Sequence, residues 1–137
     1  RDMMDAEHVE DGYANRLNAN EAVETMLKLY QGKVIDKEAS VEMLAILAGT
    51  QNHSKLPAQL PEEAIVFNKS GESEFRGIQN DLALIDYSGN VFAVCVLTEV
   101  NGDGEEPEVY DSLVAAKQIQ TIAELGSQIT EWMVRGE

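Results

Sequence analysis

Two apolar segments joined by a tight turn constrain the fold of this chain more than any other feature. Leu82–Ile85 and Val91–Leu97 consist mainly of aliphatic residues, and the sequence Tyr-Ser-Gly-Asn stands between them at positions 87–90. A short polar turn that contains glycine, between two apolar runs, predicts a β-hairpin. The second run is almost wholly apolar, which is typical of a strand covered on both faces. The hairpin therefore predicts an antiparallel sheet.

A third apolar run supplies the first predicted strand of this sheet. It covers Ala64–Phe67 and leads directly into Asn68-Lys69-Ser70-Gly71, while Arg76 begins the approach to the neighbouring strand. Lysine carries three N–H donors, serine carries a hydroxyl, and glycine lets a ligand come close to the backbone. The pattern indicates an anion-binding strand end, and the alternative is a strand end that is merely solvated.

Helical patterns flank the predicted sheet. Apolar residues recur at helical spacing from residue 21 to residue 30, after a cap at Asn18 or Asn20, and a second helix runs from a cap at Asp36 to Gly49. The segment 50–63 contains two prolines and is predicted to be a surface connection. A long last helix covers 112–132, and the glycine inside it, Gly126, indicates close packing on the sheet.

The order of these elements defines the fold class and the domain organisation. Two helices, three strands and a long C-terminal helix predict an α+β fold with an antiparallel three-stranded sheet, and 137 residues suit one domain. Within it we assign 1–18 to a loop, 19–63 to the helices, 64–99 to the sheet and 111–134 to the C-terminal helix. Since one helix covers only one sheet face, we expect the other face to be covered from outside this chain.

The charge of the chain excludes two classes of partner. A formal net charge of -15 does not suit nucleic acid, whose phosphates need lysine and arginine, nor an anionic membrane surface. No apolar run approaches the roughly 20 residues that span a bilayer. A single cysteine, Cys95, precludes an intrachain disulfide, and we interpret it as a small core residue. Because the chain begins with Arg1 rather than Met, we expect a piece of a longer or processed protein.

We predict no cofactor and no metal. His8 and His53 are far apart and have no cysteine or histidine at metal-ligand spacing. The acidic segment 101–106, with the sequence Asn-Gly-Asp-Gly-Glu-Glu, lacks the alternating ligands and the terminal bidentate glutamate of a calcium loop. We interpret it as a solvated acidic loop.

The chain resembles the C-terminal part of the penicillin-recognising serine hydrolases, and among them the class A β-lactamases. That family carries a Lys-Thr/Ser-Gly box on a strand, which matches Lys69-Ser70-Gly71. The Leu60-Pro61 before the strand, Arg76-Gly77 after it and the final segment 122–129 with Trp132 also fall in the family's order. The similarity extends over nearly the whole chain, from Arg1 to Met133.

The resemblance implies a role for each matched position. Lys69 and Ser70 would bind the carboxylate of a β-lactam or cell-wall peptide and tune proton transfer at the nucleophile. Gly71 would allow the substrate close to the strand, and the backbone N–H of Glu72 would form half of an oxyanion hole. Arg76 would approach the same carboxylate from the next strand, although the intervening turn looks shorter than in typical class A enzymes. Residues 1–18 would form the loop at the floor of the site.

Three parts of the family's machinery are missing or not matched. No serine of the chain is followed three residues later by lysine, so the nucleophile's Ser-x-x-Lys motif is absent, and no Ser-x-Asn, the second motif, precedes Lys69. Tyr13-Ala14-Asn15 mimics a variant of that second motif, but it lies too close to Lys69 and within the floor loop. For the family's floor-loop glutamate no residue is in register, which leaves Asp2, Asp5 or Glu7 as candidates for a general base.

Two functions remain open at this point. The first is part of a β-lactamase-like serine hydrolase that works through an acyl-enzyme, with the nucleophile on an N-terminal remainder of the same protein. Such proteins usually act outside the cytoplasm, so the resemblance implies an extracytoplasmic location. The enzyme could be an efficient β-lactamase, a slow hydrolase, a cell-wall DD-peptidase or an acyl-enzyme former that barely turns over. The second function is a non-catalytic binding module that retains the fold.

Overall fold

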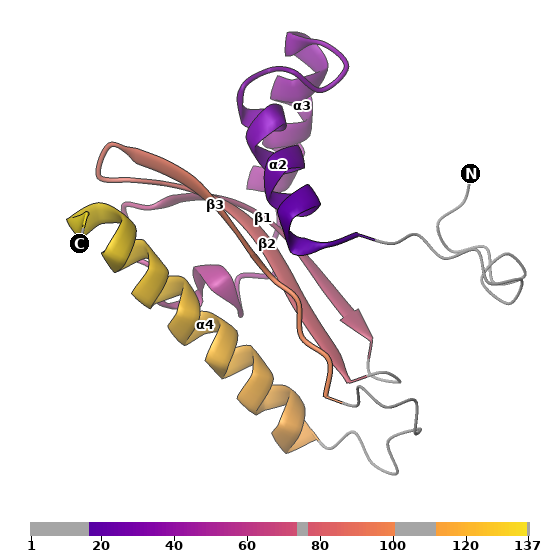
Figure 1. The fold of residues 1–137 in the computed structure, drawn as a ribbon, viewed down its shortest axis with the longest axis vertical. Coiled ribbons are helices and arrows are strands. Elements are labelled where there is room, and N and C mark those ends of the chain that lie inside the picture. Colours follow the sequence, from indigo (N-terminus) through magenta and orange to yellow (C-terminus); the bar gives the residue numbers. More distant parts are fainter. Residues whose placement is uncertain (1–16, 74–76, 101–111, 137) are drawn as a thin grey trace, which may run out of the picture.

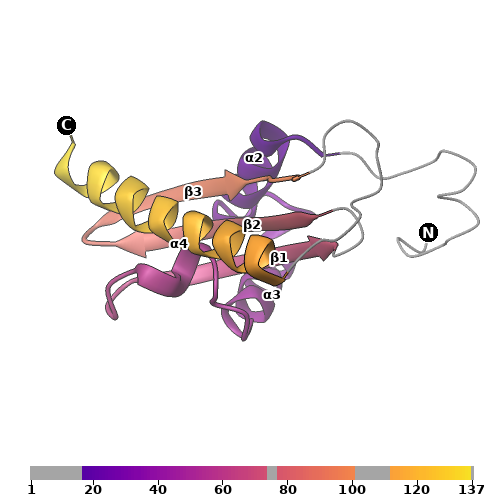
Figure 2. The same ribbon diagram turned by 90° about the horizontal axis from the view of Figure 1, so that it is seen from below.

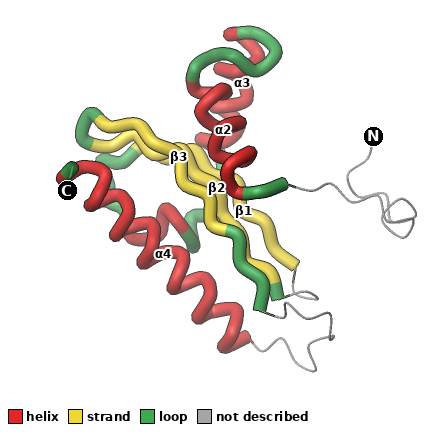
Figure 3. Tube along the Cα trace, viewed as in Figure 1, coloured by secondary structure: helices red, strands yellow, loops and turns green. Residues whose placement is uncertain are grey.

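The computed structural model describes residues 17–73, 77–100 and 112–136. In this part of the chain a three-stranded antiparallel sheet has the order β1-β2-β3, with β1 at Ile65–Ser73, β2 at Ile78–Tyr87 and β3 at Asn90–Val96. The helices are α2 (Ala19–Tyr30), α3 (Lys37–Ala48) and α4 (Ser112–Arg135), with a short 3-10 helix, η1 (Leu56–Gln59), before β1. The predicted α+β architecture is confirmed (Figures 1 and 3).

The hairpin that joins β2 and β3 has the predicted tight turn. The strands pair from Asp81 opposite Val96 to Tyr87 opposite Asn90, so only two residues form the loop. Both loop residues have left-handed backbone angles, with φ of 52° at Ser88 and 79° at Gly89. Two successive residues with positive φ define the type I′ turn, whose twist matches that of the flanking strands.

The two N-terminal helices begin at the predicted caps. The side chain of Asn18 accepts a hydrogen bond from the Glu21 N–H at 2.9 Å, and the Glu21 carboxylate accepts one from the Asn18 N–H at 3.2 Å, which is a capping box. Asp36 accepts from the Ala39 N–H at 2.8 Å and caps α3. Gly49 ends α3 as its C-cap.

The sheet separates two apolar clusters, because successive strand residues point to opposite faces. On one face Ala83 and Ile85 of β2 pack with Ile122 of α4 and with Leu56 of η1. On the other face Leu84 packs with Met26 and Leu29 of α2 and with partly buried residues of α3, which are Met43, Leu44 and Leu47. The expectation that this second face is covered only from outside the chain is therefore wrong. Figure 2 shows α4 on one side of the sheet and α2 with α3 on the other.

Two details of the helices differ from the sequence-based expectations. Val41 and Ile46, which belong to the apolar set of α3, are 57% and 73% exposed, because the inward face of the helix carries the other members of the set. Gly126 of α4 packs on η1 and not on the sheet. A Cβ atom at this position would lie 2.3 Å from the Leu56 carbonyl oxygen. The absence of a side chain at Gly126 is what allows α4 and η1 to approach so closely.

The segment before β1 is more than the predicted surface connection. Lys55 and Leu56 lie within it, and both are completely buried, with 0% relative exposure. Leu56 fills the space between the sheet and α4, while its backbone touches Gly126. This segment therefore belongs to the core and brings a buried lysine close to β1.

Candidate functional site

The Lys69-Ser70-Gly71 tripeptide lies within β1, which continues to Ser73. Among the strands that the structure describes, β1 pairs only with β2 and thus has a free edge. Phe67 packs in the cluster of α2 and α3, whereas Asn68 is bonded on the η1 side, so alternation places Lys69 on the α2–α3 face and Ser70 on the η1 face. The tripeptide's ammonium and hydroxyl therefore project from opposite faces of one edge strand.

The hydrogen bonds of two carbonyl groups indicate which backbone groups point to the free edge of β1. The Asn68 carbonyl accepts a hydrogen bond from Thr50 Oγ1 at 3.0 Å, and the Ser70 carbonyl accepts one from Lys69 Nζ. In an antiparallel pair, backbone groups of every second residue point to the same side. The same side of the strand then carries the N–H and C=O of Glu72.

A single amide links the side chains on the η1 face of β1. Asn52 Nδ2 donates to Ser70 Oγ at 3.2 Å and to Glu72 Oε1 at 3.0 Å. Ser70 and Glu72 are two positions apart on the strand and so share this face. The hydroxyl of the tripeptide and the carboxylate of Glu72 therefore sit beside one another with a common donor.

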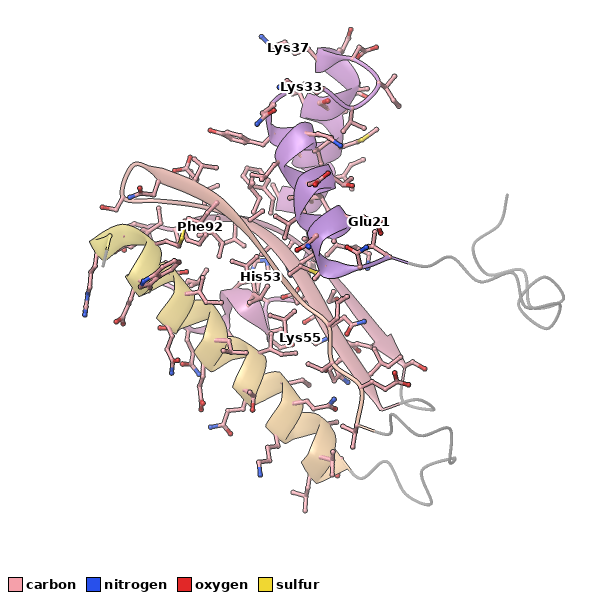
Figure 4. The ribbon with its side chains drawn as sticks, in the orientation of Figure 1. Glu21, Lys33, Lys37, His53, Lys55 and Phe92 are labelled. Atoms are coloured by element: carbon pink, nitrogen blue, oxygen red, sulfur yellow. The ribbon has the colours of Figure 1, made fainter. Side chains whose placement is uncertain are left out.

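Lys55 reaches the same carboxylate from below the strand. Its Nζ lies 2.9 Å from Glu72 Oε1, 3.2 Å from the Asn80 carbonyl oxygen and 3.5 Å from the Gly71 carbonyl oxygen. A buried ammonium is costly unless it is paired and hydrogen-bonded, and these three oxygens supply its partners. Lys55 lies beside η1, between α4 and the sheet, whereas Lys33 and Lys37 lie at the far end of the α2–α3 pair (Figure 4).

The ammonium of Lys55 also stabilises the charged form of Glu72. The hydrogen bond from Lys55 is the main reason that the pKa of the Glu72 carboxyl lies below its ordinary value, and the bond from Asn52 acts in the same direction. Partial burial opposes this shift without reversing it. Glu72 is therefore an anion at neutral pH, and the pair of Glu72 and Lys55 carries no net charge.

A second buried acid holds the start of η1 against the sheet. Asp81 of β2 is 1% exposed, and its carboxylate accepts from the Leu56 N–H at 3.0 Å and from Asn68 Nδ2 at 3.2 Å. Burial raises the pKa of Asp81, although the bonds from Asn68 and Leu56 and the charge of Lys55 oppose the rise. Asp81 thereby positions Asn68 on the strand of the tripeptide. Through its bond to Leu56 it also positions the preceding residue, Lys55.

Replacing Asp81 by asparagine should change how stability depends on pH. Because its pKa is raised in the folded protein, the folded state binds the proton more tightly than the unfolded state does. This contribution is fully present below the ordinary pKa of 3.8 and is lost as pH rises through the raised value. We expect the wild type to lose stability relative to Asp81→Asn across this window, by at most about 1.4 kcal/mol per pH unit.

Urea unfolding of both proteins from about pH 4 to about pH 7 measures this difference. The same substitution at Asp86, a half-buried residue on the same strand, is the control for the loss of a carboxylate. A constant stability difference between the wild type and Asp81→Asn at every pH would contradict the role assigned to burial.

Several predicted site residues lie outside the described part of the chain. They are Arg76, the candidate bases Asp2, Asp5 and Glu7, the Tyr13-Ala14-Asn15 motif, His8 and the acidic segment 101–106. Of the described candidates, His53 is exposed and Cys95 is half-buried. The pKa of the Cys95 thiol is raised, mainly by burial and in addition by the charge of Asp81.

The described residues contain neither a cluster of metal-ligating side chains nor a helix that could cross a membrane. Within residues 17–73, 77–100 and 112–136, no three His, Cys, Asp or Glu side chains are grouped so that they could hold a metal ion. Among the helices in the same ranges, none is both long enough and apolar enough to cross a membrane.

Four residues of the site were missed by reasoning from the sequence: Asn52, Lys55, Asn68 and Asp81. Two of them carried a signal, because Asn68 and Asp81 are polar residues inside apolar strands, where a polar side chain needs a partner. Asn52 and Lys55 gave no such signal, because they lie in a segment rich in polar residues and proline.

Comparison with known structures identifies the type of fold. The TLA-1 extended-spectrum β-lactamase is 23% identical and superposes with a TM-score of 0.73, over 96% of this chain and 46% of that chain. A class A β-lactamase from Bacteroides cellulosilyticus is 19% identical with a TM-score of 0.67, over 97% of this chain and 47% of that chain. PBP-A is 20% identical with a TM-score of 0.62, over 82% of this chain and 39% of that one. The fold is thus that of a part of the class A β-lactamases.

The sequence itself matches the model of the β-lactamase enzyme family over residues 1–133. The chain therefore belongs to the β-lactamase enzyme family, as the resemblance of its motifs predicted. It spans less than half the length of the solved structures that it resembles. No curated protein matches the sequence.

Proposed function

We propose that this chain forms the substrate-binding wall of a β-lactamase-like serine hydrolase whose nucleophile lies on an N-terminal remainder of the same protein. The observation that carries the proposal is the Lys69-Ser70-Gly71 box on a free edge strand of a chain that belongs to this family. The absence of Ser-x-x-Lys from the chain requires the nucleophile to come from elsewhere. The substrate would be a β-lactam or a cell-wall peptide amide.

The free edge of β1 supports the proposed roles of the box. A substrate that lies along this edge would meet the N–H of Glu72, which the hydrogen bonds of Asn68 and Ser70 indicate to be on the open side. An N–H fixed in a strand is a suitable oxyanion donor, because it needs no reorganisation as charge develops on the carbonyl oxygen. Gly71 presents no side chain to this approach. Arg76 would complete the site from the neighbouring strand.

Lys69 is suited to act on the face opposite to Ser70. Lys69 lies on the same sheet face as α2 and α3, but its side chain is exposed. Figure 1 shows that the Ser73 end of β1 extends beyond these two helices. An N-terminal remainder that carried the serine would have room there beside the ammonium of Lys69. The positive charge would stabilise developing negative charge and lower the pKa of a neighbouring acid. As in the family, we place the complete protein outside the cytoplasm.

The test is covalent labelling of the complete protein by penicillin. The serine oxygen would attack the β-lactam carbonyl, the ring C–N bond would break, and the ring nitrogen would take the proton. Nothing leaves in this step, so we expect the intact mass to rise by one whole penicillin molecule. A protein that folds, contains Ser-x-x-Lys and shows no adduct even at short times would contradict the proposal and favour the non-catalytic binding module.

A further inference from the structure

The carboxylate of Glu72 lies beside Ser70 and is held there by two hydrogen-bond donors, Lys55 and Asn52. It accepts from Lys55 Nζ at 2.9 Å and from Asn52 Nδ2 at 3.0 Å, and the same amide nitrogen lies 3.2 Å from Ser70 Oγ. These donors are of the kind that bind a ligand carboxylate, namely an ammonium, an amide and an adjacent hydroxyl. Glu72 thus supplies, from within the chain, the carboxylate that these donors bind.

The two charged partners differ in how they are held. The side chain of Lys55 is 1% exposed, whereas that of Glu72 is 46% exposed. The ammonium is fixed by the Asn80 and Gly71 carbonyl oxygens as well as by the carboxylate. The Lys55 side chain is therefore fixed in the interior beneath β1, while the Glu72 carboxylate approaches it from the solvent side. Only the carboxylate lies where a ligand could compete for its place.

We propose that Glu72 is a specificity-determining residue, whose carboxylate neutralises the Lys55–Asn52–Ser70 face of the site and disfavours ligands that place a carboxylate there. A ligand carboxylate at this face would have to displace an ion pair and would be repelled by Glu72 if both were present. Acyl substrates with a neutral or cationic group beside Ser70 meet no such penalty. The inference rests on the proposed function for the nature of the substrate, but not for the binding of anions.

Acetate, the simplest carboxylate, tests the inference without any acylation. Titration of the complete protein with sodium acetate at constant ionic strength is followed through the backbone amide signals of Ser70 and Gly71 by NMR. In the wild type we expect only weak binding. In Glu72→Gln, which keeps an oxygen acceptor for Lys55 but removes the negative charge, we expect acetate to bind at least about tenfold more tightly.

Two controls identify the charges involved. Glu63→Gln removes one exposed carboxylate just before β1, and it should leave acetate binding unchanged because Glu63 is not part of this hydrogen-bonded cluster. Glu72→Gln combined with Lys55→Met should return acetate binding to the weak level of the wild type. If Glu72→Gln binds acetate no more tightly than the wild type, the inference is overturned, whether or not the protein reacts with penicillin.

A pair of acylating probes connects the inference to catalysis. We expect the complete wild-type protein to be acylated faster by penicillin methyl ester than by penicillin. The ratio of these two rates is then compared with the ratio in Glu72→Gln. The order should reverse in Glu72→Gln, because the penicillin carboxylate then meets a Lys55 ammonium whose charge is no longer neutralised by Glu72. An unchanged ratio in a variant that is acylated would contradict the specificity role. Absence of acylation by both probes would contradict the proposed function, and the acetate titration would still decide the inference.

Discussion

Lys69→Ala in the complete protein is expected to slow acylation by penicillin by about 100-fold, the order of effect found when one preorganised donor is removed from an active site. The reason is electrostatic. Lys69 is a compact charge on a rigid strand, next to the edge where negative charge would develop on the substrate. The exposed side chain contributes little to the core, so the variant should fold normally. The measurement is the second-order rate of appearance of the penicillin adduct by intact-mass spectrometry.

Lys33→Ala is the matched control for this variant. Lys33 is also an exposed lysine, but it lies at the far end of the α2–α3 pair, where its Nζ donates to Gln31 Oε1 (Figure 4). Lys33→Ala removes the same charge from the protein as Lys69→Ala and should leave the acylation rate unaffected. Equal rates for Lys69→Ala and the wild type would remove the tripeptide from the mechanism, even if the protein forms an adduct.

Gly126→Ala is expected to have the largest effect on stability, a loss of about 3 kcal/mol or more. The added Cβ would lie 2.3 Å from the Leu56 carbonyl oxygen and 3.1 Å from the Leu56 Cα. These are backbone atoms of a fully buried residue, so they cannot rotate away as the end of a side chain could. The intrinsic gain of about 1 kcal/mol from alanine in a helix does not offset such a clash. Urea unfolding measures the loss.

Ala116→Gly measures separately how much the difference in helix propensity between alanine and glycine contributes to the stability of α4. Ala116 is exposed on the same helix, so this substitution should cost about 1 kcal/mol without any change in packing. If Gly126→Ala stabilises the protein by the same amount that Ala116→Gly destabilises it, α4 and η1 have room for a methyl group and the contact described above is not a tight one.

The architecture could be predicted from the sequence because it depends on local patterns. The hairpin followed from a two-residue turn between apolar strands, and the helices followed from the spacing of their apolar residues and from Asn18 and Asp36 as caps. Each of these signals lies within a few residues of the structure that it predicts. The family resemblance gave the tripeptide its expected catalytic roles, and the match of residues 1–133 to the family model confirms the family, though not the roles of its residues.

The site beneath β1 could not be predicted because its contacts join distant residues. Lys55 meets Glu72 across 17 positions and Asn80 across 25, and no local pattern encodes either contact. The segment that carries Lys55 was interpreted as surface because it contains prolines and polar residues. Its burial depends on Gly126, about half the chain away, which lets α4 approach η1. The opposite orientations of Lys69 and Ser70 could have been predicted from the sequence, since side chains alternate between the two faces along a strand.

The two outer strands of the sheet have a consequence for the chain when it is handled alone. In the described ranges β1 and β3 each pair on one side only, so each presents a row of backbone donors and acceptors to any other extended segment. At neutral pH a net charge of -15 keeps identical molecules apart. Near the isoelectric point of 4.3 that repulsion vanishes while the strand edges remain. Mild acid would then favour self-association through added strands, and a partner strand would protect the chain against it.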